Sequence, residues 1–176
     1  MKATRPTPTE APPAASFDEF FRAWFPTLAR AMALIVRDLD EGGEIAQEGF
    51  TRLYGTWSHM SSLDHARNFV FRTSINLARS HLRKRRPLQF IGLRTGERLS
   101  SVTDESDTTN DRILIAEALV RLSRRQRECV VLVDYVGHDA ESAGRILSLR
   151  PSTVRVHLAR GRGQLRKLLS EWKEER

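Results

Sequence analysis

The sequence predicts an all-α protein of two small helical domains that a flexible acidic linker joins. Apolar residues recur at helical spacing on both sides of residues 87–110, whereas this stretch shows no periodicity and is rich in Gly, Ser, Thr and acidic residues. The chain has 176 residues, 40% of them hydrophobic, which suits one mid-sized or two small globular domains. We therefore predict domains over residues 16–86 and 111–172.

The N-terminal residues 1–15 are biased towards Pro, Thr and Ala, which predicts a disordered tail. The first helix starts at Ser16, which forms a capping-box pattern with Glu19. Apolar residues then recur at helical spacing as far as Leu39, and Pro26 predicts a kink or a break within this helix.

A second helix is expected after the EGG sequence at 41–43, with one apolar face and one acidic-polar face. A third helix should run from about Asp64 to Arg85 and end at Pro87. Ten of the 13 aromatic residues lie between Phe17 and Phe71, so this first domain can build a compact core from few helices.

The second domain should begin near Asp111, and its next helix has a capping box at Ser123. The apolar run 129–136 fits a buried strand or a buried helix, and we favour a helix because no partner strand is present. Gly137 should end it, and Asp139 should cap a short helix over 140–147. A turn at 148–150 then leads to Pro151, which suits the first position of a helix, so the pattern predicts a helix-turn-helix.

The formal net charge of +7 is concentrated in two blocks, residues 79–86 and 150–167, neither of which contains an acidic residue. In the last helix, the residues opposite the apolar stripe include small ones, Ser152 and Ala159, which allow close entry into a DNA major groove. Arginines on that face can reach guanine edges or phosphates, so we expect DNA contacts there, including Arg150, Arg155 and Arg160.

The first basic block ends a helix, where cations also interact favourably with the helix dipole. Its five basic residues exceed that need, so we expect a DNA-tracking surface there. The adjacent loop 57–64 is polar and aromatic and could hold an unpaired base. Trp57 fits this role and a place in the core equally well.

The residues do not predict an enzyme, a metal site or a cofactor. The single cysteine, Cys129, excludes an intramolecular disulfide, and the five histidines lack metal-ligand spacing. A phosphate-binding glycine loop and a nucleophile elbow are both missing. The sequence has no apolar stretch of 18 residues and no secretory signal, so we expect a cytoplasmic protein without membrane insertion.

Three segments together resemble the extracytoplasmic-function (ECF) sigma factors, small two-domain members of the bacterial sigma-70 family. The segment GEIAQEGFTRLYGTW (43–57) is similar to their region 2.2, and ARNFVFRTSINLARSHLRKRR (66–86) is similar to regions 2.3 and 2.4. LSRRQRECVVL (122–132), followed by AESAGRILSLRPSTVRVHLARGRGQLRKLL (140–169), is similar to region 4.

The resemblance implies a factor that binds core RNA polymerase, recognises promoter DNA and helps to open it, and that an anti-sigma factor controls. The expected polymerase contacts are Glu44, Gln47, Glu48 and Phe50. The residues expected at the minus-10 element are Trp57, His59, Asn76, Arg79, Arg83 and Lys84. Those expected at the minus-35 element are Arg150, Ser152, Thr153, Arg155, His157 and Arg160.

The sequence departs from the family pattern in the turn GHDAE (137–141), which is a residue shorter than usual, at Glu44, where Asp is customary, and at two serines. Ser142 stands where a hydrophobic residue is common, and Ser148 stands where glycine is common. The alternative function is a stand-alone helix-turn-helix regulator, which explains residues 111–176 but gives the acidic-polar helix at 44–57 no role.

Overall fold

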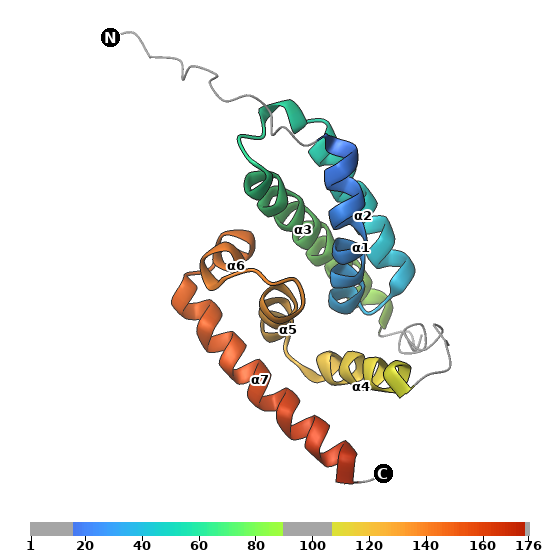
Figure 1. Cartoon of the computed structure of the whole chain (residues 1–176). Coiled ribbons are helices and arrows are strands. Elements are labelled where there is room, and N and C mark those ends of the chain that lie inside the picture. Colours follow the sequence, from blue (N-terminus) through green and yellow to red (C-terminus); the bar gives the residue numbers. More distant parts are fainter. Residues whose placement is uncertain (1–15, 90–106, 175–176) are drawn as a thin grey trace.

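The computed structural model describes residues 16–89 and 107–174, which are helical almost throughout (Figure 1). Within these ranges the chain has no β-strand, which confirms the all-α prediction. The elements are α1 (Phe17–Val36), α2 (Leu39–Tyr54), η1 (Trp57–His59), α3 (Leu63–Gln89), α4 (Asp107–Arg121), α5 (Arg124–Val130), η2 (Val131–Tyr135), α6 (Ala140–Leu147) and α7 (Pro151–Glu174). We call α1–α3 the N-terminal unit and α4–α7 the C-terminal unit.

Helix α1 starts as predicted, because Ser16 and Glu19 form both hydrogen bonds of a capping box. Pro26 lies inside α1 without breaking it. Helix α2 begins earlier than predicted, at Leu39, because the Asp38 carboxylate accepts a hydrogen bond from the Glu41 amide at 3.1 Å and caps the helix.

Both glycines after that cap lie within α2, and Gly42 allows the helix to pack closely on α1. A Cβ atom at Gly42 would lie only 2.4 Å from the backbone nitrogen of Ala33. Because only a residue without a side chain fits there, Gly42 is a packing feature, and the two glycines do not mark the predicted helix boundary.

The predicted linker 87–110 is helical at both of its ends. Helix α3 continues to Gln89, two residues past Pro87, and α4 begins at Asp107 rather than near Asp111. The remaining predicted linker residues, 90–106, lie outside the described residues, as does the predicted N-terminal tail. It stays a prediction that the two units are separate domains with a flexible linker.

In the C-terminal unit, the ambiguous apolar run is helical, as we favoured. Helix α5 has the predicted capping box at Ser123 and passes into one π-helical turn, η2. Gly137 then adopts a positive φ of 84°, and Asp139 caps α6 by accepting a hydrogen bond from the Ser142 amide. The turn and the start of α7 at Pro151 complete the predicted helix-turn-helix.

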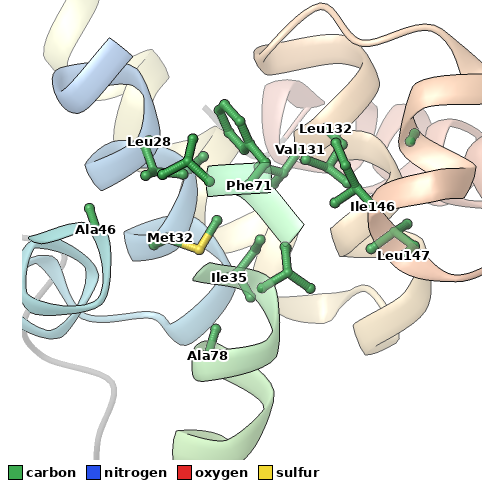
Figure 2. Close-up of a cluster of buried hydrophobic side chains, with 14 of the residues drawn as sticks. Leu28, Met32, Ile35, Ala46, Phe71, Ala78, Val131, Leu132, Ile146 and Leu147 are labelled. Atoms are coloured by element: carbon green, nitrogen blue, oxygen red, sulfur yellow. The ribbon is translucent and has the colours of Figure 1, made fainter. Parts of the chain in front are cut away.

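One hydrophobic cluster runs through both units (Figure 2). Met32 and Ile35 of α1 and Phe71 of α3 are fully buried beside Val131 and Leu132 of η2. Helix α5 lies between α7 and the N-terminal unit in Figure 1, and α6 packs on α3. The two units therefore form one closed body, with α7 on the side away from α1–α3.

Candidate nucleic-acid interface

The outward face of α7 is open to solvent, as the sequence predicts. Val154 and Leu158 are buried, and Gly161 packs so closely on Val130 that a Cβ atom there would lie 2.9 Å from a Val130 methyl group. This buried row fixes the rotation of α7, so the opposite row points outwards. The exposed residues of that row are Ser152, Arg155, Val156, Ala159 and Arg160.

The predicted minus-35 residues divide between that face and its edge. Arg150 in the turn is exposed, like Ser152, Arg155 and Arg160, whereas Thr153 and His157 are half-buried. Val156 lies at the centre of the face, and we had not placed it among the contact residues. An exposed valine there matches the apolar contacts that proteins make with thymine methyl groups.

The ion pairs on this face are exposed. Arg155 donates a hydrogen bond to Glu141 of α6 at 2.6 Å, but the two side chains are 59% and 52% exposed. Exposed pairs of this kind contribute between about 0 and 1 kcal/mol, so Arg155 can exchange Glu141 for another anion at little cost. Among the described residues, neither Arg150 nor Arg160 has an acidic partner.

Helix α3 presents an exposed polar row that contains part of the predicted minus-10 set. Asn76 and Arg83 are seven positions apart, and Arg72 shares their face. Lys84 is also exposed, and so is His59 in η1. Arg72 is missing from our prediction because it lies upstream of the basic block, although its spacing to Asn76 could have revealed it.

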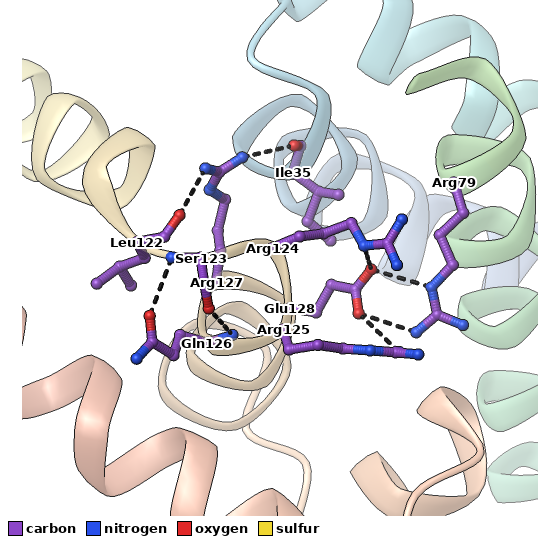
Figure 3. Close-up of polar contacts among 9 residues, drawn as sticks. All are labelled: Ile35, Arg79, Leu122, Ser123, Arg124, Arg125, Gln126, Arg127 and Glu128. Carbon is purple, nitrogen blue, oxygen red and sulfur yellow. Dashed lines mark hydrogen bonds and ion pairs between the residues drawn. The ribbon is translucent and has the colours of Figure 1, made fainter. Parts of the chain in front are cut away.

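Arg79, three positions after Asn76, lies at the edge of this row, but its guanidinium is paired within the chain, so the prediction of Arg79 as a minus-10 contact does not hold for this closed structure. Its Nε and Nη2 atoms donate hydrogen bonds of 3.0 and 2.9 Å to the two carboxylate oxygens of Glu128 on α5 (Figure 3). The Glu128 side chain is 0% exposed. Arg124 and Arg125 lie 3.8 and 3.2 Å from the same carboxylate.

Phe50 is also not a surface residue. It is only 2% exposed and packs against the rings of Phe17, Phe20, Phe21 and Phe25, with centroid distances from 4.9 to 6.2 Å. We therefore correct the prediction of Phe50 as a polymerase contact, because no partner can reach its ring.

Trp57 belongs to the same aromatic cluster. It is half-buried, with centroids 5.4 Å from both Phe17 and Phe20. Of the two roles that the sequence left open for Trp57, the core role fits this structure.

The other predicted polymerase residues form one exposed face of α2. Glu44, Gln47 and Glu48 occupy positions i, i+3 and i+4, so they project from the same side of the helix. Glu48 accepts a hydrogen bond from Arg52 at 2.8 Å, and Tyr54 at the end of α2 is 68% exposed. This face combines negative charge with an exposed aromatic ring.

Arg127 is a buried cation whose role the sequence did not reveal (Figure 3). It is only 3% exposed and donates hydrogen bonds to the carbonyls at the end of α4, those of Leu119, Val120 and Leu122. It also donates to the Ile35 carbonyl of α1 at 3.2 Å. Burial lowers the pKa of Arg127 to about 10, with a further contribution from Arg37, so the group remains charged at neutral pH.

His138 is buried where α3 meets the turn before α6. Its Nδ1 atom lies 3.2 Å from Nη2 of Arg67, and its ring packs edge-on against Phe71. Burial, and then the nearby Arg67, lower its pKa to about 4, so His138 is neutral at pH 7. A cavity of 310 Å³ lies beside it, with Asn68 and Arg145 among its lining residues.

Within residues 16–89 and 107–174, no three His, Cys, Asp or Glu side chains are grouped as metal ligands. The same part of the chain contains no helix with the length and apolarity needed to cross a bilayer. Cys129 is buried, and burial raises its pKa to about 11, which makes it an unreactive core thiol.

The comparisons with known proteins agree with this geometry. The family "Sigma-70, region 4" matches residues 112–165, which include most of the C-terminal unit. RNA polymerase sigma-E factor of Streptomyces avermitilis is 28% identical over 87% of this chain and 84% of its own length. ECF RNA polymerase sigma factor SigM of Mycobacterium tuberculosis is 26% identical over 88% of this chain and 77% of its own.

Two solved structures share the fold. The sigma factor RpoE of Bartonella quintana, in complex with the anti-sigma factor NepR, aligns with a TM-score of 0.75 at 22% identity, over 88% of this chain and 96% of its own. CnrH, in complex with the cytosolic domain of CnrY, aligns with a TM-score of 0.64 at 20% identity, over 88% of each chain. The relatives cover both units, and the family match covers the helix-turn-helix, so this chain is similar to the ECF sigma factors of the sigma-70 family over both of its units.

Proposed function

We propose that this chain binds core RNA polymerase, recognises the minus-35 and minus-10 elements of a promoter and helps to open the DNA. The observation that carries the proposal is the open basic face of α7, held outwards by the buried row that includes Val154 and Leu158. A stand-alone regulator would need only this helix-turn-helix, whereas the similarity to sigma factors extends over 87% of the chain.

At the minus-35 element, we assign base reading to Arg150, Ser152, Arg155 and Arg160, with Val156 against a thymine methyl group. An α-helix fits the major groove, and arginine can donate two hydrogen bonds to a guanine edge. Thr153 and His157 lie at the edge of this face, where phosphate contacts are the better assignment.

At the minus-10 element, we assign the exposed row of α3, Arg72, Asn76 and Arg83, together with Lys84 and His59. These side chains supply positive charge and hydrogen-bond donors to a melted strand. For the polymerase contact we assign Glu44, Gln47 and Glu48 of α2 and add the exposed ring of Tyr54. An acidic face with an aromatic edge suits a basic partner surface.

The remaining parts of the proposal concern location and control. We place the protein in the cytoplasm, where RNA polymerase acts, and assign it no catalytic reaction. Because RpoE of Bartonella quintana is solved with an anti-sigma factor, we also propose an anti-sigma partner for this chain.

Co-purification with core polymerase and run-off transcription from a specific promoter test the function. A stand-alone regulator would bind DNA but would neither join the polymerase nor direct new transcripts. Glu48→Lys should weaken polymerase binding without changing the helical content, because Glu48 and its ion pair with Arg52 are exposed. Glu171→Lys on α7 is the matched control, and unchanged assembly with Glu48→Lys would remove α2 from the interface.

A further inference from the structure

The cavity beside His138 is lined by polar groups. It has a volume of 310 Å³ and lies between the start of α3 and the residues that begin α6. Seven of its eight lining residues have a polar side chain, and the eighth is Gly137. Two of the seven are arginines and two are aspartates, so the formal charges of the lining cancel while His138 is neutral. Such a cavity suits a polar ligand, because an apolar one would leave the lining groups without hydrogen bonds.

Three lining residues, Arg67, Asn68 and His138, are buried or half-buried, and we call them the inner residues. Each has a buried atom without a hydrogen-bond partner among the described residues: Arg67 Nε, Asn68 Oδ1 and His138 Nε2. His138 as a whole is only 4% exposed. A buried polar atom without a partner destabilises a protein. A ligand that supplied the missing partners from the cavity would therefore gain these hydrogen bonds on binding.

The contact between Arg67 and His138 decides which of these atoms are donors. Nη2 of Arg67 lies 3.2 Å from Nδ1 of His138, and arginine can only donate, so Nδ1 is the acceptor. Because burial lowers the pKa of His138 to about 4, the ring carries one proton at neutral pH, and that proton lies on Nε2. Nε2 of His138 and Nε of Arg67 are therefore both N–H donors that lack an acceptor. A carboxylate is a suitable acceptor, since it forms strong charge-assisted hydrogen bonds with arginine.

Three other lining residues, Asp64, Asp139 and Arg145, are exposed, and we call them the outer residues. One carboxylate oxygen of Asp139 accepts a hydrogen bond from the Ser142 amide at 2.6 Å. Hydrogen bonds from Ser142 lower the pKa of Asp139, so this carboxyl is charged at neutral pH. Arg145 donates to the Ser142 hydroxyl at 2.8 Å through Nη2 and has further N–H groups. The two carboxylates favour a cationic group at this end and disfavour a ligand with several negative charges.

We propose that this cavity binds a small zwitterion of the amino-acid class, with its carboxylate at the inner residues and its ammonium group at Asp64 and Asp139. Arg145 donates a further hydrogen bond to the ligand carboxylate. The volume of 310 Å³ lies at the lower end of the range for ligand pockets, which suits a molecule of this size. The site shares no residue with the assigned DNA and polymerase contacts, so it is an additional function and does not depend on the proposed one.

Nuclear magnetic resonance titration of the full chain at neutral pH tests the site without polymerase or DNA. The probe is L-glutamine, a zwitterion whose neutral side chain can both donate and accept hydrogen bonds. It should shift the backbone amide signals of Gly137 and His138 and the Nε2 signal of His138, with a dissociation constant of roughly 1 mM. Acetate and methylammonium each carry only one of the two charges, so each should bind about tenfold more weakly or worse.

Arg145→Gln tests the carboxylate contact with little risk to the fold, because Arg145 is exposed. The loss of a charge-assisted hydrogen bond should lower the affinity for L-glutamine about tenfold, and circular dichroism should show unchanged helical content. Arg22→Gln removes an exposed arginine of α1 that does not line the cavity, so it should leave the affinity unchanged. Equal affinities of Arg145→Gln and the wild type would place any binding elsewhere and overturn the site.

Asp64→Asn distinguishes a zwitterion from a plain carboxylate. The loss of this negative charge should weaken the binding of L-glutamine several-fold but strengthen that of acetate, because it removes a repulsion. Asp18→Asn, at an exposed position in the first turn of α1, is the matched control. Changes in the same direction for both probes would overturn the zwitterion. If L-glutamine causes no saturable shift in the wild type, the cavity binds only water and the proposal is wrong.

Discussion

Helices α3 and α7 carry the two basic blocks of the chain and differ in their surroundings. Helix α7 packs on the rest of the C-terminal unit through one side, and its other side is exposed from Ser152 to Arg160. Helix α3 packs on α1 and α2 on one side and on α6 on another. Its basic residues therefore divide between exposed ones, such as Arg72 and Arg83, and partly buried ones that contact the C-terminal unit, Arg67 and Arg79.

The difference teaches that positive charge in a sequence is not the same as positive charge available to a partner. On α7, Arg155 and Arg162 have acidic partners, but the pairs are exposed and weak. On α3, Arg79 is paired with the carboxylate of Glu128, whose side chain is 0% exposed. A basic block thus predicts a surface that binds a polyanion only if its residues are not in buried ion pairs within the chain.

The largest expected effect comes from comparing the stability of Arg127→Met with that of Arg162→Met. Arg127 satisfies carbonyls of α4 and α1 from a buried position, so its loss should lower the free energy of unfolding by about 3 kcal/mol or more. Arg162 lies in an exposed pair with Asp134, so its loss should cost less than about 1 kcal/mol. Urea denaturation measures both, and similar values would contradict the contrast.

Arg155→Ala tests the outward face. Binding to a cognate promoter should weaken by about 1 to 3 kcal/mol if Arg155 reads a base. The stability of the protein should hardly change, because the pair with Glu141 is exposed. Titrations on cognate and unrelated DNA distinguish the outcomes, since an equal loss on both would make Arg155 a phosphate contact. Glu141→Ala is the control for losing the ion pair alone.

The pH dependence of protein stability tests the buried position of His138 between the two units. Its pKa of about 4 in the folded protein lies below the ordinary value of 6.5, so the unfolded chain binds the proton more tightly. The contribution of neutral His138 to the free energy of unfolding is complete above about pH 6.5, and it is lost as the pH falls through 4. From pH 7 to pH 5, this group should reduce the free energy of unfolding by about 2 kcal/mol.

Parallel urea titrations of the wild type and His138→Gln at both pH values measure that effect. The variant should lose most of this pH dependence, whereas His59→Gln should keep it because His59 is exposed. The pKa of Asp139 is lowered by hydrogen bonds from Ser142, so Asp139 titrates below this window. An unchanged slope in His138→Gln would mean that His138 is not held neutral by the contact between the units.

Local signals predicted most of the fold. Capping residues such as Ser16, Ser123 and Asp139, and the proline at position 151, act within one helical turn, so they can be read from neighbouring residues. Gly42 misled us because its role depends on Ala33 of another helix. The Arg79–Glu128 pair joins residues 49 positions apart, and no local pattern could have indicated it.

Phe50 was predictable, and the resemblance misled us. It shares the apolar face of α2 with Gly49 and Leu53, and helical periodicity places it in the core. Family resemblance places a segment at an interface but does not decide which face of the helix meets the partner. Where the two disagreed, the periodicity was the better guide because burial follows directly from it.

The smallest expected effect concerns the turn that aims α7. Ser148 has φ 58° and ψ 48°, a left-handed conformation that costs a residue with a Cβ atom roughly 1 to 2 kcal/mol. Ser148→Gly should raise the free energy of unfolding by about 0.5 to 1 kcal/mol, since the greater freedom of glycine in the unfolded chain offsets part of the gain. Ser142→Gly, within α6, should destabilise instead, and thermal melting measures both.

Promoter affinity should not change with Ser148→Gly, because the substitution keeps the backbone that α7 follows. This outcome would sharpen the contrast between the helices: the face of α7 depends on the backbone path and a buried apolar row, whereas Arg79 of α3 is held by an ion pair with Glu128. A loss of affinity without a loss of stability would mean that the Ser148 side chain itself contacts DNA. The outward surface would then begin before Arg150, in the turn.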